Sequence, residues 1–126
     1  MKMKQVIVMR KDLNMRKGKM IAQGAHASMG AVYALSIPCD GYIAIGCTED
    51  EREWFLNEFT KICVGVDSEE ELVDIFDKAK ASEIRCALIT DSGLTEFKGI
   101  PTKTCMALGP APNDAIDVIT GHLKLL

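Results

Sequence analysis

Short, continuous apolar runs alternate with segments of helical periodicity along this chain, and that alternation is the strongest constraint on its fold. The runs at residues 4–10, 61–66 and 86–90 are rich in Val and Ile, as in strands that are covered on both faces. Residues 18–36 and 69–82 lie between these runs and read as helices. Strands joined through helices pair in parallel, with right-handed crossovers. The pattern therefore predicts an α/β fold.

The last part of the chain breaks this alternation. A fourth strand is expected at 103–108, and the segment 91–103 before it has two glycines and a proline but no helical period. Without a crossover helix, this strand should run antiparallel. The expected architecture is a three-layer α/β/α fold with a small mixed, mostly parallel four-stranded sheet. Because no linker or repeat is visible, we expect residues 1–126 to form one domain.

Local signals assign the remaining segments. Residues 37–47 are interrupted by a proline and two glycines, and we expect them to be irregular. The Thr-x-x-Glu spacing of residues 48–51 is that of a capping box and predicts a short helix, and residues 68–71 repeat the pattern with Ser. Two prolines and a glycine within 110–121 predict the start and end of a last helix.

Composition limits the cellular compartments in which the protein is expected and the kinds of site that it can contain. The longest apolar runs have only a few residues, far fewer than the roughly 20 of a membrane-spanning helix, and the first is too short for a signal peptide. The five cysteines form no Cys-x-x-Cys pair, which favours free thiols in a reducing compartment. This spacing, with only two histidines, does not match a metal site. We therefore expect a cytoplasmic protein with no membrane association, no metal and no cofactor.

Charge is unevenly distributed, although the net charge is only −3. Residues 1–19 carry seven basic side chains and one acidic one, or +6, and the rest of the chain carries −9. Arg16, Lys17 and Lys19 lie at the expected start of the first helix, where exposed cations oppose the helix dipole by about 0.3–1 kcal/mol each. Together with the backbone N–H groups, they attract a phosphate or a carboxylate. This end of the chain predicts an anion site, and the alternative is an incidental basic turn.

Polar residues from distant segments should meet at one edge of the sheet, because ligands of open α/β sheets bind outside the carboxyl ends of the strands. Residues 10–17 and Asp91 follow two of the expected strands, and Lys19, Gln23 and His26 form a stripe on the first helix. Alternatively, Asp91 caps its own turn and His26 makes a local hydrogen bond. The sequence contains no glycine-rich phosphate loop and no Gly-x-Ser-x-Gly elbow.

Several spaced motifs resemble those of one known family. They are Lys17-Gly18-Lys19-Met20-Ile21-Ala22-Gln23-Gly24-Ala25-His26-Ala27, Thr90-Asp91-Ser92-Gly93-Leu94-Thr95, Thr104, Leu108-Gly109-Pro110 and Ile119-Thr120-Gly121-His122-Leu123-Lys124-Leu125. In these motifs the chain is similar to the second, archaeal- and eukaryotic-type peptidyl-tRNA hydrolase family. The resemblance covers about residues 4–36 and 60–126.

The resemblance implies a metal-free esterase that cleaves the bond between a nascent peptide and the 3′ adenosine of tRNA, so that both are reused. It also implies a three-layer α/β domain, commonly found as a dimer. The catalytic residues implied by motif position are Lys19, Asp91, Thr95 and Thr104. The residues expected to contact the acceptor stem and 3′ end are Arg10, Lys11, Arg16, Lys17, Gln23 and His26.

Two other functions stay open. Leu94 and Glu96 flank Thr95 where the family usually has a cation and a glutamine, and this difference favours a non-catalytic module that binds tRNA or a nucleotide. Hydrolysis of another small ester or amide is the second alternative.

A homodimer is expected mainly from the resemblance. Trp54, Phe55 and Phe59 lie beside the partly apolar segment 42–45, and any of them that the core leaves uncovered would form an apolar patch. Such patches mark interfaces. The alternative is that these side chains complete the core.

Overall fold

The structure is a computed structural model and describes residues 2–94 and 96–126. Its main sheet has the strand order β4-β1-β6-β5, formed by β1 (Met3–Arg10), β4 (Lys61–Val66), β5 (Cys86–Asp91) and β6 (Thr102–Pro112). The helices are α1 (Lys17–Tyr33), α2 (Glu49–Glu53), α3 (Glu69–Ala81) and α4 (Asn113–Thr120). A π-helix, η1 (Trp54–Glu58), extends α2, and β2 (Ser36–Cys39) pairs with β3 (Tyr42–Ile45) in a hairpin.

The expected fold class is confirmed, with one difference in how the strands are ordered. β1 and β4 pair in parallel, and β6 is antiparallel to both of its neighbours, β1 and β5. Three strands therefore run in one direction, but only the β1–β4 pair is parallel. The expectation that strands 61–66 and 86–90 pair with each other was wrong, because they form the two edges of the sheet with β1 and β6 between them.

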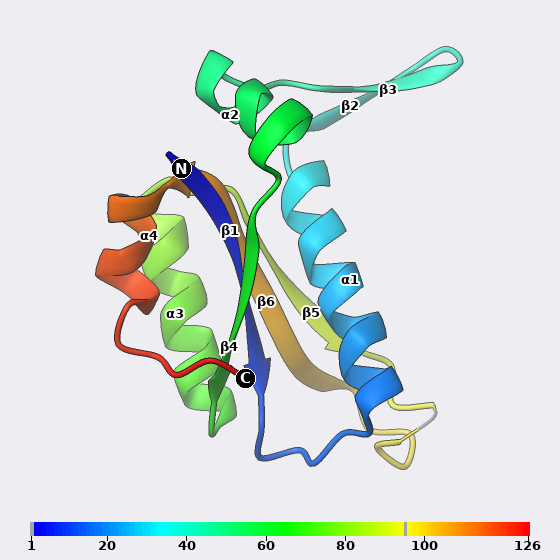
Figure 1. Ribbon diagram of the computed structural model, residues 1–126. Coiled ribbons are helices and arrows are strands. Elements are labelled where there is room, and N and C mark those ends of the chain that lie inside the picture. Colours follow the sequence, from blue (N-terminus) through cyan, green and yellow to red (C-terminus); the bar gives the residue numbers. More distant parts are fainter. Residues whose placement is uncertain (1, 95) are drawn as a thin grey trace.

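Helices cover both faces of the sheet, α1 on one face and α3 and α4 on the other (Figure 1). Val8 belongs to a buried cluster with Leu72 of α3 and Ile116 of α4. The next residue, Met9, points to the opposite face and joins a second cluster with Ala27 of α1. The alternation of successive strand residues between the faces thus produces the three layers that the apolar runs predicted.

Helix α1 packs onto β5 and β6 through its small residues. Ala27 and Ala31 are fully buried, and a Cβ at Gly30 would lie 2.9 Å from that of Ala87. Helix α1 therefore packs closely against the sheet. Its larger apolar residues point away from the sheet, since Ile21 is 74% exposed and Met29 is 48% exposed. The helix ends at Tyr33 rather than at residue 36, because β2 begins there.

The expectation that residues 37–47 are irregular was wrong. They form most of the β2–β3 hairpin, whose strands meet at Asp40-Gly41 and which projects from the body of the molecule beyond the end of α1 (Figure 1). Gly41 has a φ of +82°, a conformation that favours glycine. Asp-Gly is a strong signal for a two-residue hairpin. The proline at position 38 obscured it.

Both predicted helix starts after a capping pattern are confirmed. The Thr48 side chain accepts from the Glu51 N–H at 3.2 Å, and the Glu51 carboxylate accepts from the Thr48 N–H at 2.8 Å. At α3, Ser68 accepts from the Glu71 N–H, but the Glu71 carboxylate accepts from Asp67 instead. The second pattern is therefore only half of a capping box.

The last strand is longer than the predicted 103–108, because pairing with β1 continues to Pro112. Pro112 is also the residue that precedes α4, and Gly121 follows its last turn, so the predicted position of the final helix is confirmed.

The aromatic residues near η1 divide between core and surface. Trp54 is fully buried and its indole N–H donates to the Thr60 carbonyl at 3.0 Å. Phe59 is 54% exposed, and Tyr42 and Ile43 of the hairpin are 66% and 54% exposed. Trp54 thus completes the core, while the others contribute apolar surface.

Candidate active site

The carboxyl ends of β1, β4 and β5 point to the same edge of the sheet, where β6 and α1 begin (Figure 1). We call this side of the molecule the carboxyl edge. It is the edge at which the sequence pattern predicted a site. Two chain segments far apart in sequence, the first turn of α1 and the end of β5, meet there.

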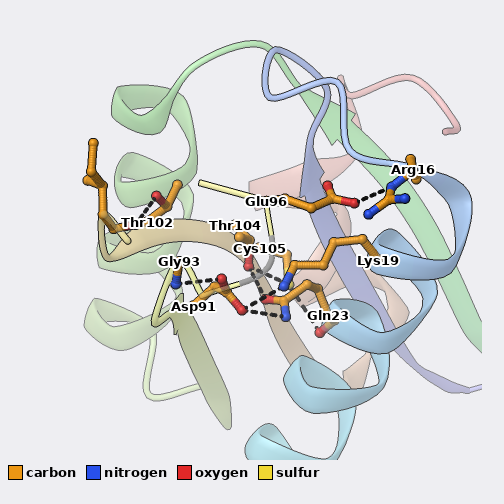
Figure 2. Close-up of polar contacts among 10 residues, drawn as sticks. Arg16, Lys19, Gln23, Asp91, Gly93, Glu96, Thr102, Thr104 and Cys105 are labelled. Atoms are coloured by element: carbon orange, nitrogen blue, oxygen red, sulfur yellow. Dashed lines mark hydrogen bonds and ion pairs between the residues drawn. The ribbon is translucent and has the colours of Figure 1, made fainter. Parts of the chain in front are cut away.

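Lys19 and Asp91 form an ion pair at this edge. The Lys19 Nζ lies 2.9 Å from Oδ1 of Asp91, and the two side chains are 14% and 13% exposed. Figure 2 shows them pointing toward each other from α1 and from the end of β5. The centroid of the Phe97 ring lies 5.7 Å from the Lys19 Nζ. A largely enclosed cation therefore sits beside a largely enclosed carboxylate.

Two further donors hold the Asp91 carboxylate. The Gly93 N–H donates to Oδ2 at 2.8 Å, and the Gln23 side-chain amide donates to Oδ1 at 3.3 Å (Figure 2). The hydrogen bond from Lys19, followed by that from Gly93, lowers the pKa of Asp91 below its ordinary value of 3.8. Asp91 is therefore ionised at neutral pH. Asp91 also caps its own turn, because it accepts from the Gly93 N–H. It therefore both meets the other polar residues at the edge of the sheet and caps its turn.

Gln23 links the Asp91 carboxylate to Thr104 of β6. The Thr104 hydroxyl is fully buried and donates to the Gln23 amide oxygen at 2.6 Å. Because a carboxylate accepts only, the amide nitrogen of Gln23 must face Asp91, and its oxygen is left for Thr104. Lys19, Gln23, Asp91, Gly93 and Thr104 thus form one connected group, which we call the Asp91 cluster.

Cys105 of β6 contacts the backbone of α1 beside the cluster. Its thiol donates to the backbone carbonyl of Gln23 at 3.2 Å. Burial raises the pKa of Cys105 to about 11, so the thiol keeps its proton at neutral pH and remains a donor. This contact fixes α1 against β6 beside the cluster.

A cavity of about 400 Å³ opens at the start of α1 and is lined by Arg16, Gly18, Lys19 and Glu96. Arg16 is 82% exposed, and its Nε donates to the Glu96 carboxylate at 2.6 Å. Helix α1 has no acidic residue in its first turn and no side-chain cap. The cavity is thus bordered by Arg16 and Lys19, two of the three cations that the sequence assigned to an anion site.

The four remaining predicted RNA contacts, Arg10, Lys11, Lys17 and His26, do not join the Asp91 cluster. Lys11 pairs with Asp67 at 3.4 Å, and Lys17 and His26 are exposed on α1. The Arg10 side chain is only 10% exposed; its guanidinium donates to both Asp12 oxygens, at 3.1 and 2.6 Å, and to the Lys103 carbonyl at 3.0 Å. Arg10 is therefore engaged within the protein.

Of the four predicted catalytic residues, the structure brings Lys19, Asp91 and Thr104 together, and Thr95 lies outside the described residues. The role of Gly93 was missed. Its φ of +85° favours glycine, and a Cβ there would clash with the backbone of Ile100. The Asp-x-Gly spacing carries that signal, because a turn that returns an N–H to its own aspartate often needs a residue with positive φ.

No group of three or more His, Cys, Asp or Glu side chains in residues 2–94 and 96–126 is arranged to hold a metal ion. In the same part of the chain, no helix is both long enough and apolar enough to span a membrane.

Comparison with known proteins assigns the chain to a family. The family described as peptidyl-tRNA hydrolase PTH2 matches residues 3–126. The chain is 43% identical to a peptidyl-tRNA hydrolase of Methanocaldococcus jannaschii over 124 residues, which are 98% of this chain and all of that protein. It is 40% identical to the Methanothermobacter thermautotrophicus peptidyl-tRNA hydrolase, over 98% of this chain and all of that protein.

A eukaryotic relative matches a part of its length. The chain is 41% identical to a probable peptidyl-tRNA hydrolase 2 of Dictyostelium discoideum, over 97% of this chain and 54% of that protein. The resemblance that the spaced motifs suggested is confirmed. This chain belongs to the PTH2 family of peptidyl-tRNA hydrolases.

Proposed function

We propose that this protein hydrolyses the ester bond between the peptide and the tRNA in peptidyl-tRNA, with the Asp91 cluster as its catalytic centre. The observation that carries the proposal is the enclosed Lys19–Asp91 pair, 2.9 Å apart, at the edge of the sheet where α/β proteins bind ligands. Membership of the PTH2 family supports the same activity. We place the protein in the cytoplasm, where such a substrate occurs.

Asp91 orients the attacking water. Its lowered pKa makes it a weak base, so direct proton abstraction has little driving force, whereas an ionised carboxylate readily accepts a hydrogen bond from water. The Gly93 and Gln23 donors hold the carboxylate in place, and Thr104 holds Gln23. The cluster is therefore organised before the substrate binds.

Lys19 stabilises the charge that develops during the reaction. When water attacks the carbonyl carbon of the ester, the carbonyl oxygen becomes an oxyanion. A fixed cation in an enclosed site is well suited to stabilise this charge. The bond between the acyl carbon and the ribose oxygen then breaks. One proton of the water ends on the ribose oxygen and the other goes to solvent, leaving a peptide carboxylate and a tRNA with a free 3′ end.

The acceptor stem lies along the basic start of the chain in this proposal. Arg16 lines the cavity beside Lys19, Lys11 and Lys17 are exposed on the same basic segment of the chain, and His26 is exposed further along α1. Arg10 and Gln23 are buried and bonded within the protein, so they support the RNA-binding surface from inside. Each phosphate contact should contribute about 0.7–0.9 to the slope of log affinity against log salt.

The deciding experiment measures release of an N-blocked amino acid from tRNA by the purified protein. Asp91→Asn and Lys19→Ala should each lower kcat by about 10²- to 10⁴-fold. Asp74→Asn and Lys78→Ala are the matched controls, because they break an exposed ion pair on α3, with N–O distance 2.9 Å, away from the carboxyl edge. Full turnover by both site variants would refute the assignment, and tRNA binding without turnover by the wild type would favour a non-catalytic module.

We also propose a homodimer that uses the open face beside α1. A groove of about 450 Å³ runs between α1 and β4, over the half of the sheet that α1 leaves uncovered. Ile7, Met9, Cys63 and Leu126 contribute to its lining. Helix α1 has no Asp, Glu, Lys or Arg from residue 20 to 33, although much of that segment is exposed. A second copy, with its own uncharged α1 face, has the complementary apolar surface.

A further inference from the structure

The side chains of Glu96 and Arg16 face each other across the mouth of the active-site cavity. The Arg16 Nε donates to the Glu96 carboxylate at 2.6 Å, and the residues come from segments 80 positions apart (Figure 2). Arg16 is 82% exposed, whereas Glu96 is only 14% exposed. The acid is therefore fixed by the protein, and the cation is the partner that remains accessible from solvent.

The loop that carries Glu96 is held by its own backbone. The Gly99 N–H donates to the Gly93 carbonyl at 2.9 Å, and the Ile100 N–H donates to the Phe97 carbonyl at 2.9 Å. Gly93 and Gly99 both have positive φ, +85° and +78°. Because Arg16 is the exposed partner, rotation of its side chain would separate the pair and leave these backbone contacts intact.

The Glu96 carboxylate lies near the start of α1, where the surrounding cations favour a bound anion. Helix α1 offers no acidic side chain of its own in its first turn, and Arg16 immediately precedes it. Arg16 and Lys19 line the same cavity as Glu96. A guanidinium at a helix start is a good partner for a phosphate, and Glu96 supplies a carboxylate there instead.

We propose that Glu96 competes with the RNA backbone for Arg16 and thereby sets the affinity of the protein for tRNA. The inference rests on the proposed function, since it takes tRNA to be the ligand of this edge. In the free protein the Arg16 guanidinium is paired with Glu96. To bind, a phosphate of the tRNA acceptor end must displace the Glu96 carboxylate from this guanidinium. Exposed ion pairs are weak, so the exchange lowers the affinity without preventing binding.

The test is a double-mutant cycle on the binding of fluorescently labelled, deacylated tRNA, at salt concentrations from about 50 to 200 mM. Glu96→Gln should tighten binding about 3- to 10-fold and steepen the salt slope by about 0.7–0.9, because Arg16 gains one phosphate contact. Arg16→Gln should weaken binding more in the Glu96→Gln protein than in the wild type. Glu70→Gln is the charge-matched control, since Glu70 is exposed in the first turn of α3.

Several results would overturn the inference. The inference fails if Glu96→Gln changes the tRNA affinity no more than Glu70→Gln does, or if Glu96→Gln weakens binding. It also fails if Glu96→Gln has the same effect with and without Arg16, or if neither the wild type nor the Glu96→Gln protein binds tRNA. If Glu96→Gln tightens tRNA binding but the wild type does not release the blocked amino acid, the inference stands and the proposed hydrolysis fails. Thermal unfolding of each variant shows that the affinities compare folded proteins.

Discussion

Thr104 and Gln23 lie 81 residues apart in the chain, and the hydroxyl of Thr104 donates to the amide oxygen of Gln23 across 2.6 Å. Both side chains are buried, at 0% and 3% exposure. Through this contact, the central strand β6 fixes which end of the amide faces Asp91. The Thr104 hydroxyl therefore helps to orient a donor to the Asp91 carboxylate without touching that carboxylate itself.

We predict that Thr104→Val lowers kcat by about 10- to 100-fold with little change in KM, because the Gln23 amide can then rotate away from Asp91. Stability should fall by about 1–3 kcal/mol, since a buried acceptor loses its donor. Thr104→Ser should restore both quantities. Thr102→Val is the control, because the Thr102 hydroxyl bonds only locally, to the Ile100 carbonyl at 2.8 Å. A kcat equal to that of the wild type would contradict the role assigned to Thr104.

The titration of Asp91 gives a second prediction. Because Lys19 and Gly93 lower its pKa in the folded protein, Asp91 stabilises the fold above pH 3.8, and this contribution is lost as the pH falls through the lowered pKa. The pH profile of kcat/KM should show no step from Asp91 above pH 3.8. Carboxyl NMR measures the titration directly, and in Lys19→Met the pKa should rise toward the ordinary value. An unchanged pKa in that variant would exclude Lys19 as the main cause.

Arg85 should contribute strongly to stability. Its guanidinium donates to Glu51 at 3.1 and 3.0 Å, to the Gly46 carbonyl at 2.7 Å and to the Val32 carbonyl at 3.2 Å, and the side chain is 2% exposed. Arg85→Met leaves three acceptors without their donor, and we expect a loss of about 3 kcal/mol in urea unfolding. Arg52→Met, on the exposed side of α2, should change stability by less than about 0.5 kcal/mol. Similar midpoints for the two variants would contradict the prediction.

The proposed dimer predicts that Ile21→Asp produces a monomer. The substitution puts a charge on the apolar face of α1, beside the groove. Light scattering at micromolar concentration should then give 13.8 kDa instead of twice that mass. Val118→Asp, at a residue of α4 that is 86% exposed, is the matched control and should leave the dimer intact. A wild-type protein of 13.8 kDa throughout the accessible range would refute the dimer.

Much of the fold could be predicted because it depends on local signals. The apolar run that contains Val8 and the capping pattern at Thr48 predicted elements that the structure confirms. The meeting of Lys19 and Asp91 also followed, because strands that run in the same direction have their carboxyl ends at one edge of the sheet. The insertion of β6 between β1 and β5 could not be predicted, because strand order depends on tertiary packing and has no local signature.

The finer arrangement of the site depends on contacts that no periodicity encodes. Gln23 was expected on a polar stripe of α1 that contacts RNA, yet it is buried and bonded to Thr104 and Asp91. The pairing of Glu96 with Arg16 likewise depends on how the loop after β5 folds back. Such contacts join distant segments, so they follow only once the strand order is known.

The central position of β6 also has a consequence for how the protein forms during synthesis. Chains leave the ribosome from the N-terminus, and β5 has its strand partner in the main sheet only in β6. The sheet therefore stays split into a β1–β4 part and an unattached β5 until residues 102–112 have emerged. Asp91, at the end of β5, cannot be held beside Lys19 before that point. The Lys19–Asp91 pair should thus form only after all of β6 has emerged from the ribosome.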